Sequence, residues 1–508
     1  MLTALILISC SHATRPDAVI SVQTGAGTPI SPFIYGANGP DWNKMNVPFT
    51  MARQGGNRMT AYNWETNASN AGNDWHFQND NYLGQSDEPG WTVRTFLQAA
   101  QSHGAAAILT VPTAGYVSAD KKGDGDVRKT PDYLKTRFIK SYAHKPGSFT
   151  YPPDVNDHAV YQDEFVHWIE TIQSPKTPVW FMLDNEPDLW GSTHAEIWSH
   201  NPTYAEIIAN NIEYATAIKN AAPNALVFGP ANYGWGGFHT FQGAPDANGR
   251  DFLNTYLDAL HEAGEKDGKR LLDVLDIHWY PEAKGGGTRI TEKGNQATAE
   301  ARIQASRSLW DPSYVEDSWI SDSIGHKPIQ LLPTILGQIG EHYPGTKFSI
   351  SEYNYGGNID ISGAIAEADV LGIFGRYGLF AASNWGISPG DTAEIAGFNA
   401  FLNFDHRGGH FGDQELKVSG ETPASDSVYA SKDSTTPGRY VVVVINKTAA
   451  PRTFRISLDG LNVSAVNAYS YTASQLQAPQ QTQIPATGPT LTFPAPPLSV
   501  TTLAVTAQ

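Results

Sequence analysis

The stretch PVWFMLDNEP, residues 178–187, places an unbroken apolar run, Val179–Leu183, directly before Asp184, Asn185 and Glu186. A short run that is apolar at every position is typical of a parallel strand whose two faces are both buried. Polar groups that follow such a strand at once are typical of a site at the carboxyl ends of the strands. The stretch therefore predicts a buried strand of an α/β fold, with chemistry at its end.

Seven further segments of this kind occur along the chain, and amphipathic segments separate them. The candidate strands are 32–38, 52–62, 105–113, 225–234, 274–281, 347–355 and 379–388. Stretches such as 91–103 and 204–220 place apolar side chains on one helical face. Eight strands alternating with helices predict a (β/α)8 TIM barrel spanning residues 31–393. A doubly wound open sheet is the alternative, but no strand leads into a GxGxxG turn of the dinucleotide-binding kind.

The pattern changes after about residue 395. Short alternating strands follow one another, separated by Gly, Pro, Asn and Ser, with no helical pattern between them. This pattern of short strands and turns predicts an additional all-β sandwich domain. The stretch AVISVQ, residues 18–23, is a similar strand that precedes the barrel. We therefore expect one discontinuous β-sandwich domain formed by residues 17–30 and 394–508.

The N-terminal residues 1–16 resemble a secretory signal. Their apolar run, MLTALILIS, is too short to span a bilayer. Leu7-Ile8-Ser9-Cys10 is similar to a bacterial lipobox, in which the cysteine is lipidated. The basic residues that normally begin a signal are missing, so an N-terminus with an incidental cysteine is the alternative. We expect a secreted, extracellular protein with no membrane-spanning segment, and the sequence leaves lipid anchoring through Cys10 open.

The charge balance restricts the class of partner. The net charge is −17, from 34 Lys and Arg against 51 Asp and Glu, which argues against nucleic acid or an anionic membrane. The chain also contains 13 Trp. Indole rings serve either as platforms for sugars or as core residues. A neutral ligand such as a polysaccharide fits this composition, and a monomer is expected.

Two carboxylates stand out at the strand ends, Glu186 and Glu352. On the fourth and seventh strands of a barrel they would face each other across its mouth. Glycoside hydrolysis needs such a pair: one acid protonates the leaving oxygen, and the other attacks the anomeric carbon or activates water. A glutamate at a strand end is otherwise often a capping or ion-paired residue. Asp184 and Asp188 are expected to be structural.

Three stretches together resemble one known family. They are GGNRMTAYNWETNASNAGNDWHFQND (55–80), LDNEPDLW (183–190) and ISEYNYGG (350–357), and they are similar to glycoside hydrolase family 44. The resemblance extends in order over most of the chain. It implies a (β/α)8 retaining glycosidase that cleaves internal β-1,4 bonds of glucans such as carboxymethyl-cellulose, with activity that extends to xyloglucan, xylan or lichenan.

Roles for single residues follow from this resemblance. Glu186 would be the acid/base, Glu352 the nucleophile, and Asn185 a contact of the 2-hydroxyl of the sugar being cleaved. No cofactor is expected for catalysis. Two other functions remain open, a xylanase or mannanase on the same scaffold and a polysaccharide-binding protein whose barrel has lost catalysis. Retention of both carboxylates argues against the last of these.

Other polar and aromatic residues at the strand ends are candidate substrate contacts. Tyr280 is placed to donate a hydrogen bond to Glu352, and His278 either does the same or packs. Arg58 either reaches a carboxylate or forms an ion pair at the barrel floor. The candidate sugar platforms are Trp64, Trp235, Trp279 and Trp385. Trp385 is expected beside the scissile bond, and core packing is the alternative for each of the other three.

The long loop 114–162 is rich in Asp, and a second long loop spans residues 282–346. Loops of this length usually shape a site or carry ligands. Solvated carboxylates are the ordinary interpretation of the first loop, since its spacing does not match an EF-hand. A structural Ca²⁺ is the alternative, with ligands from Glu65, Asp154, Asp157 and Asp163.

Overall fold

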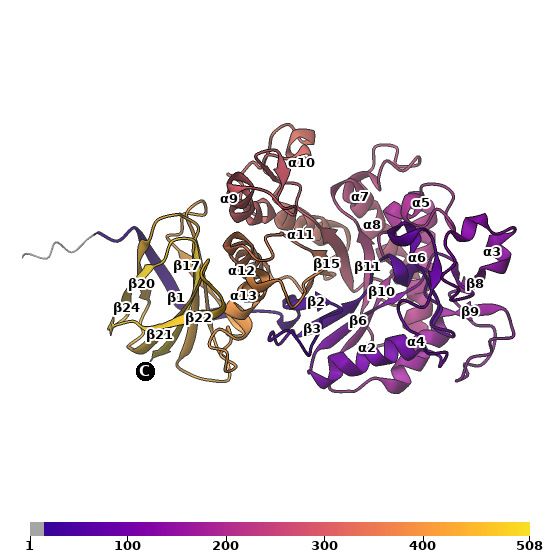
Figure 1. Ribbon diagram of the computed structural model, residues 1–508, viewed down its shortest axis with the longest axis horizontal. Coiled ribbons are helices and arrows are strands. Elements are labelled where there is room, and N and C mark those ends of the chain that lie inside the picture. Colours follow the sequence, from indigo (N-terminus) through magenta and orange to yellow (C-terminus); the bar gives the residue numbers. More distant parts are fainter. Residues whose placement is uncertain (1–14, 508) are drawn as a thin grey trace, which may run out of the picture. The chain divides into compact units, whose positions relative to one another are not determined.

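The computed structural model describes residues 15–507, and the chain divides into two compact units (Figure 1). One unit is Ile30–Asn403. The other joins Phe404–Gln508 to the segment that ends at Pro29, as far as these are described. Cys10, and with it most of the predicted signal or lipoprotein-like segment 1–16, lies outside the described residues. No helix among residues 15–507 combines the length and the apolar character that crossing a membrane requires.

The larger unit is built on a closed barrel of eight parallel strands. Their order around the barrel is β10-β11-β12-β15-β16-β2-β3-β6. The strands are β2 (Gly36–Asn38), β3 (Met51–Gln54), β6 (Ala106–Val111), β10 (Val179–Leu183), β11 (Val227–Asn232), β12 (Val274–Trp279), β15 (Lys347–Tyr353) and β16 (Ala381–Asn384). Their side chains are almost all buried, as expected for parallel strands covered on both faces. The predicted (β/α)8 barrel with a separate all-β domain is confirmed.

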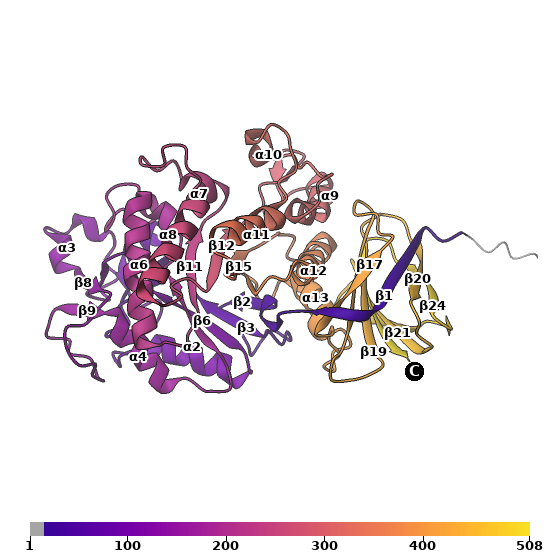
Figure 2. The same cartoon turned by 180° about the vertical axis from the view of Figure 1, so that it is seen from behind.

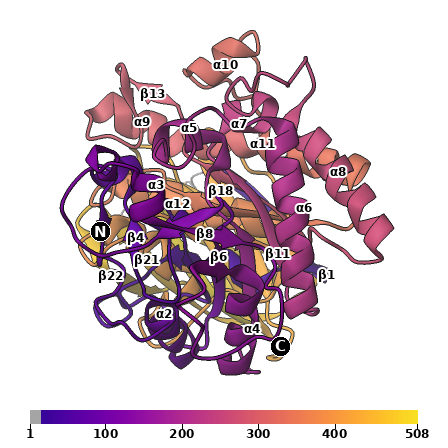
Figure 3. The same ribbon diagram turned by 90° about the vertical axis from the view of Figure 1, so that its right-hand side faces the viewer.

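Helices cover the outside of the barrel, and Figure 3 shows several of them around the strands. They are α2 (Trp91–Ser102), α4 (Gln162–Ile172), α6 (Tyr204–Ala221), α8 (Phe252–Asp267), α11 (Leu331–His342), α12 (Ile361–Arg376) and α13 (Thr392–Leu402). The start of α6 follows from its sequence. Thr203 Oγ1 accepts the backbone N–H of Glu206, and the Glu206 carboxylate accepts the N–H of Thr203, which forms a capping box.

Shorter elements shape the loops at the strand ends. They are η1 (Pro32–Ile34), α1 (Asn57–Thr60), β4 (Ser69–Asn70), η2 (Gly72–Trp75), β5 (Asn79–Asp80), η4 (Pro187–Leu189), α5 (Trp190–Thr193) and α7 (Trp235–Thr240). The predicted strand 52–62 is too long. Gly56 adopts a positive φ of 88°, which turns the chain after Gln54 into α1.

Both long loops contain secondary structure of their own. The first holds β7 (Tyr116–Ser118), η3 (Val127–Lys129), α3 (Tyr133–Thr136), β8 (Phe138–Tyr142) and β9 (Ala159–Tyr161), and its three strands form a small sheet. The second holds β13 (Lys284–Gly285), β14 (Thr288–Arg289), α9 (Gln296–Ala305), η5 (Ser306–Leu309) and α10 (Trp319–Ser323), followed by α11. The side chains that these segments carry therefore have defined positions.

The second unit is all-β. Its strands are β1 (Ala18–Pro29), β17 (Gln414–Ser419), β18 (Asp426–Lys432), β19 (Arg439–Asn446), β20 (Arg452–Leu458), β21 (Val463–Thr472), β22 (Gln475–Gln483), β23 (Ala486–Thr487), β24 (Thr490–Ala495) and β25 (Ser499–Ala507). They follow one another in the order β22-β21-β25-β19-β18-β17-β1-β20-β24-β23. β1 comes from the far end of the sequence and lies between β17 and β20 (Figure 2).

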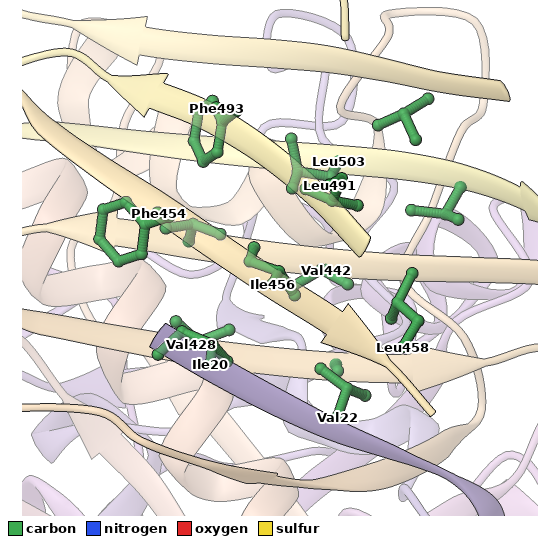
Figure 4. Close-up of a cluster of buried hydrophobic side chains, with 14 of the residues drawn as sticks. Ile20, Val22, Val428, Val442, Phe454, Ile456, Leu458, Leu491, Phe493 and Leu503 are labelled. Carbon is green, nitrogen blue, oxygen red and sulfur yellow. The ribbon is translucent and has the colours of Figure 1, made fainter. Parts of the chain in front are cut away.

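One apolar core holds this unit together (Figure 4). Phe454 and Ile456 of β20 and Phe493 of β24 pack in the same cluster as Val442 of β19 and Leu503 of β25. Alternate residues of β1 also belong to this core and are buried, whereas Val19 between them is half exposed. The N-terminal segment is therefore an internal strand of the all-β unit.

The predicted domain boundary at residues 393 and 394 is wrong by about ten residues, because it falls inside α13. That helix belongs to the barrel unit, which ends at Asn403. Nearly every residue of α13 is buried, so its sequence lacks the polar face that makes a helix recognisable. For this reason the sequence of α13 shows no helical pattern.

Shortening Ile20 tests the assignment of β1 to the all-β core. Ile20 is fully buried among apolar side chains, so Ile20→Ala should lower the free energy of unfolding of this unit by about 2–5 kcal/mol. Val19→Ala is the matched control and should change it by less than about 0.5 kcal/mol, because Val19 is half exposed. Calorimetry of both variants measures the difference, and equal effects would contradict the assignment.

Candidate active site

The turn after β10 directs Glu186 into the mouth of the barrel. Asp184 and Glu186 both adopt left-handed backbone conformations, with φ of 63° and 43°. Such conformations are costly for residues other than glycine and concentrate at functional sites. The Glu186 N–H donates to the carbonyl of Ala231 at the end of β11, 3.0 Å away. This bond anchors the turn to the neighbouring strand.

Glu186 and Glu352 come together with one imidazole between them. His278 Nδ1 lies 2.8 Å from Glu186 Oε1 and 3.5 Å from Glu352 Oε2. One carboxylate oxygen of each glutamate and this nitrogen all lie within 4.8 Å of one another. All three side chains are buried. The barrel thus brings together two carboxyl groups that are 166 residues apart in the sequence.

Glu352 receives a strong donor at each carboxylate oxygen. Arg53 Nη1 lies 2.6 Å from Oε1, and the Tyr280 hydroxyl donates to Oε2 over 2.7 Å. Charge-assisted and hydroxyl donors at both oxygens fix the orientation of this carboxyl group. Arg53 is fully buried and also donates to Asn185 Oδ1, 2.8 Å away. Sequence reasoning missed Arg53, although an arginine inside the otherwise apolar start of a strand was a usable signal.

Glu186 has a different environment. Burial raises its pKa to about 7, against an ordinary value of 4.5; the charge of Arg53 opposes this shift and that of Asp74 adds to it. Burial also lowers the pKa of His278 to about 3, so this imidazole is neutral. A neutral imidazole either donates its Nδ1–H to ionised Glu186 or accepts the proton of neutral Glu186. The two carboxyl groups are therefore distinguished by their surroundings.

The other polar residues of the quoted stretch hold the turn. Asp184 Oδ1 accepts from Thr60 and from the N–H of Asn185, and Oδ2 accepts the N–H of Thr113. Asp188 accepts from the N–H of Tyr233 and from Gln242. Burial raises the pKa of Asp184, and it raises that of Asp188 to about 7. Both aspartates connect the turn to neighbouring loops rather than facing Glu352.

Two hollows are lined by residues that contact Glu352 or the neighbour of Glu186. A cavity of about 710 Å³ is lined by Gly56, Arg58, Trp75, Tyr82 and Trp385, among others. Gly56 N–H donates to Asn185 Oδ1 at its inner end. A smaller cavity of about 70 Å³ is lined by Tyr233, Trp235, Tyr280 and Trp319, among others. Tyr280 connects this second hollow to Glu352.

The exposed tryptophans in these hollows include two that sequence reasoning missed. Trp385 is 37% exposed, Trp75 is 56% exposed and Trp319 is 46% exposed. Trp75 lies in η2 and Trp319 begins α10, so both come from loop elements rather than from strand ends. Polar residues directly precede each of them in the sequence, in GNDWH and EDSWI. A tryptophan in such a context is a signal of an exposed ring.

Two of the predicted platforms are core residues. Trp64 is only 1% exposed and packs against Phe165 and Trp168, each at 5.7 Å between ring centroids. This contradicts its prediction as a sugar contact. Both of these neighbours belong to α4, so the ring of Trp64 lies against a helix of the barrel exterior. Trp279 is equally buried and packs on Phe238.

Arg58 lies in the larger cavity without contacting either glutamate of the pair. It pairs with Asp80 at 2.6 Å, and its guanidinium lies over the ring of Tyr82, 4.2 Å from the centroid. The prediction of a contact between this residue and a carboxylate therefore holds only for Asp80. The arginine that reaches Glu352 is Arg53, which points inward from β3.

The predicted calcium ligands do not form a compact group. Among the described residues, the only set of three metal-ligating side chains with ligand atoms within 4.8 Å is Glu186, His278 and Glu352. The Asp163 carboxylate instead accepts the backbone N–H of Lys145 with both oxygens, 3.0 Å each. Burial raises the pKa of Glu65 to about 8, and the negative charges of Asp157, Glu164 and Asp154 add to the shift.

The barrel and the carboxyl pair at the ends of its fourth and seventh strands are those of a (β/α)8 glycoside hydrolase. The model of glycoside hydrolase family 44 matches residues 68–283. The structure is similar to the family 44 endoglucanase Cel44A of Clostridium thermocellum, with a TM-score of 0.90, 38% identity, and coverage of 96% of this chain and 100% of that one. A xyloglucanase of the same family from Paenibacillus polymyxa, solved with xyloglucan, gives a TM-score of 0.91, 35% identity and coverage of 97% and 100%.

Two curated relatives are longer than this chain. A beta-mannanase/endoglucanase A of Caldicellulosiruptor saccharolyticus is 40% identical over 460 residues, which are 84% of this chain and 34% of the relative. An endoglucanase A of Paenibacillus lautus is 39% identical over 459 residues, which are 86% and 64%. This chain thus spans about one third of the length of the first relative and less than two thirds of the length of the second. The chain belongs to glycoside hydrolase family 44.

The raised pKa of Glu186 predicts a pH-dependent stability. A carboxyl group whose pKa is raised by folding contributes stability that is fully present below its ordinary pKa of 4.5 and is lost as the pH rises through about 7. Glu186→Gln cannot ionise and escapes this loss. Between about pH 4 and pH 8, its free energy of unfolding should rise by about 3 kcal/mol relative to that of wild type.

Denaturant titrations at several pH values measure this gain. The matched control is Glu265→Gln on the exposed side of α8, which should follow wild type at every pH. A constant difference between Glu186→Gln and wild type across the range would show that Glu186 ionises normally.

Proposed function

We propose that this protein is a retaining endo-β-1,4-glucanase that hydrolyses internal bonds of cellulose-type glucans by double displacement. The observation that carries this proposal is the approach of Glu186 and Glu352, whose nearest contributing oxygens lie within 4.8 Å. Retaining glycosidases hold their carboxyl groups about 5–5.5 Å apart, whereas inverting enzymes leave about 6.5–9.5 Å for a water molecule. The short separation supports direct attack by one carboxylate.

In the first step, Glu352 attacks the anomeric carbon. Arg53 and Tyr280 hold its carboxylate oriented until the carbon–oxygen bond forms. Glu186, with a pKa of about 7, carries the proton that the departing glycosidic oxygen takes up as the old bond breaks. The products are a glycosyl ester of Glu352 and the shortened chain with a free hydroxyl group.

In the second step, Glu186 acts as a base. Esterification removes the negative charge of Glu352, so the charge of Arg53 is no longer balanced there and lowers the pKa of Glu186 more strongly. The ionised Glu186 accepts a proton from water, whose oxygen attacks the anomeric carbon and displaces Glu352. The product keeps its original anomeric configuration, and Glu186 is protonated again.

The two hollows support an extended, uncharged polysaccharide as substrate. Exposed indole rings at Trp385 and Trp75 in the larger hollow, and at Trp319 in the smaller one, match the flat C–H faces of pyranose rings. Asn185 offers its amide N–H groups to a sugar hydroxyl, since Arg53 and Gly56 use only the amide oxygen.

Activity on xyloglucan, xylan or lichenan belongs to the same proposal, and the xyloglucanase relative supports the first of these. A xylanase or mannanase is the alternative on this scaffold, and one relative carries a mannanase name. The carboxyl geometry argues against a non-catalytic polysaccharide-binding protein. We also propose a monomer exported from a bacterial cell, with lipid attachment through Cys10 still open. The supporting observation for export is the sequence of residues 1–16.

Substitution of each carboxyl group tests the catalytic assignment. Glu186→Gln and Glu352→Gln should each lower kcat/KM on carboxymethyl-cellulose by about 10³-fold or more, while Glu265→Gln keeps wild-type activity. Proton NMR of the first products should show the β-anomer. Azide should restore turnover to Glu352→Gly and give an α-glycosyl azide.

Each failure of this test has a distinct meaning. A wild type that binds cello-oligosaccharides without hydrolysing them would favour the binding-protein alternative. Active Gln variants would refute the assignment of Glu186 and Glu352. Parallel reducing-end assays on cellulose, xylan, xyloglucan and mannan decide between glucanase, xylanase and mannanase.

We further propose that a structural Ca²⁺ binds where Glu65 approaches the loop that carries Asp154 and Asp157. The fit of the residues is partial. Glu164 supplies a buried Oε2 with no donor among the described residues, while its Oε1 accepts from Lys145 and Thr150. The negative charges of Asp157, Glu164 and Asp154 around Glu65 support a cation there, with Lys145 as the positive charge already present. Asp163 fits less well, because the backbone of Lys145 uses both of its oxygens.

Removal of calcium tests this site. EDTA should lower the Tm of wild type by several degrees, and added Ca²⁺ should restore it, because a ligand that binds only the folded state stabilises it. Glu65→Gln should abolish the response to Ca²⁺. Asp132→Asn, an exposed position in the same loop, should keep it. An unchanged Tm after chelation would exclude the site.

A further inference from the structure

A buried carboxyl group outside the barrel joins the two strands that carry Glu352 and Trp385. Glu367 of α12 accepts a hydrogen bond from the Tyr353 hydroxyl at Oε1, 2.6 Å away, and one from Asn384 Nδ2 at Oε2, 3.3 Å away. Tyr353 directly follows Glu352 on β15, and Asn384 directly precedes Trp385 at the end of β16. One side chain therefore connects the immediate neighbours of both residues.

Backbone contacts make the same connection tighter. The Trp385 N–H donates to the Tyr353 carbonyl over 2.9 Å, and Asn354 Nδ2 donates to the Trp385 carbonyl over 2.9 Å. The strands themselves pair at Tyr353 and Asn384. A shift of Glu367 would therefore be passed to the peptide groups on either side of Trp385 and to the residue after Glu352.

Glu367 is tightly enclosed between two helices. It is buried, and a Cβ on Gly397 of α13 would lie 2.7 Å from Glu367 Cβ, so the two helices meet directly at this point. No ion pair of Glu367 is found among the described residues, and both of its donors are neutral. Burying a carboxyl group without an ion pair is costly, and an apolar residue would hold the helices together at lower cost.

A second carboxyl group lies beside the first. Glu394 of α13 is buried, and neither of its oxygens has a hydrogen-bond partner among the described residues. The titratable and charged groups that face this pair are Tyr353 and Tyr355 from the β15 side, Asp391 from the start of α13 and Arg302 from α9. Arg302 donates to carbonyl oxygens and to Ser362 rather than to either glutamate.

We propose that Glu367 is a positioning residue that sets the placement of Glu352 relative to the Trp385 ring. The inference rests on the proposed glucanase function. Glu367 touches neither the substrate nor the reacting atoms, and it acts through Tyr353 and Asn384. Two ionised carboxylates in this space would repel each other across the contact between α12 and α13, and the bridge to the strands would loosen.

The ionisation behaviour agrees with this arrangement. Burial raises the pKa of Glu367 to about 7, from an ordinary 4.5. Burial also raises the pKa of Glu394 well above its usual range, and the charges of Glu367 and Asp391 add to the shift. Protonation is thus favoured by folding, so its contribution is complete at acid pH and is lost as the pH rises through these values. The bridge should fail on the alkaline side.

Tyr353→Phe tests the bridge with the smallest change, since it removes one hydroxyl group and keeps the ring that packs on Phe374. We expect kcat on carboxymethyl-cellulose to fall about tenfold, because small misplacements of reacting groups cost this much or more. Tyr256→Phe is the matched control. It removes an equally buried hydroxyl, which donates to Asn211 over 2.8 Å between α8 and α6, and it should lose similar stability with unchanged kcat.

The pH profile separates positioning from bracing. Glu367→Gln keeps an acceptor for Tyr353 but cannot ionise, so it should retain most of kcat at about pH 6 and lose less activity than wild type towards about pH 9. Glu367→Ala should lose kcat about tenfold at both pH values. Titration of each variant with cellohexaose, followed by tryptophan fluorescence, reports whether the indole platform still binds sugar.

The outcomes are distinguishable from failure of the proposed function. If wild type hydrolyses and Tyr353→Phe behaves like Tyr256→Phe, Glu367 only braces the fold and the inference is wrong. An alkaline limb that is identical in Glu367→Gln and wild type would overturn the expected failure of the bridge at alkaline pH. If wild type neither hydrolyses nor binds cellohexaose, the proposed function fails, and the inference fails with it.

Discussion

The contact between Arg53 and Glu352 inside the barrel is the constraint on which the site depends. Both side chains are buried, and a buried charge is tolerated only when a partner and further hydrogen bonds compensate its lost hydration. Arg53 on β3 and Glu352 on β15 come from strands that β16 and β2 separate in the closed barrel, so their contact crosses the barrel interior. Asn38, Asn185 and Met182 also accept from the same guanidinium. The residues at the mouth are therefore arranged around one cation.

This arrangement explains why two identical carboxyl groups behave differently. Glu352 takes a charged and a hydroxyl donor, whereas Glu186 has only a neutral imidazole and remains protonated up to about pH 7. A pair of acids separated in this way by their environments can act as nucleophile and proton donor. Both residues are glutamates at the end of an apolar strand, so the residues themselves carry no such distinction, and only the family resemblance assigned a role to each. The distinction arises only from what the fold places around each of them.

Sequence reasoning succeeded where a periodic pattern or a strand end carried the signal. The eight buried strands were visible as apolar runs, and Glu186 and Glu352 were visible as their polar ends. It failed where burial removes the pattern, as in α13, or where a turn redirects the chain, as between Gly56 and Trp64. Arg53 was overlooked because a charge inside a strand argues against burial until its partner is known. Trp75 and Trp319 lie on loops, whose positions follow from no repeat.

The interior of the barrel contains more carboxyl groups than nearby positive charges that could stabilise their ionised forms. Asp276 on β12 accepts from Ser349 and Ser351 of β15, and burial raises its pKa to about 7 even though Arg53 opposes the shift. The same two influences compete at Glu186 with the same result. One guanidinium in direct contact with one carboxylate is thus the arrangement that needs the fewest buried charges. Glu186 and Asp276, which feel Arg53 only from a distance, keep their protons near neutral pH. The protonated acid that the proposed first step needs therefore follows from the burial of Glu186, while the direct contact of Arg53 is with Glu352.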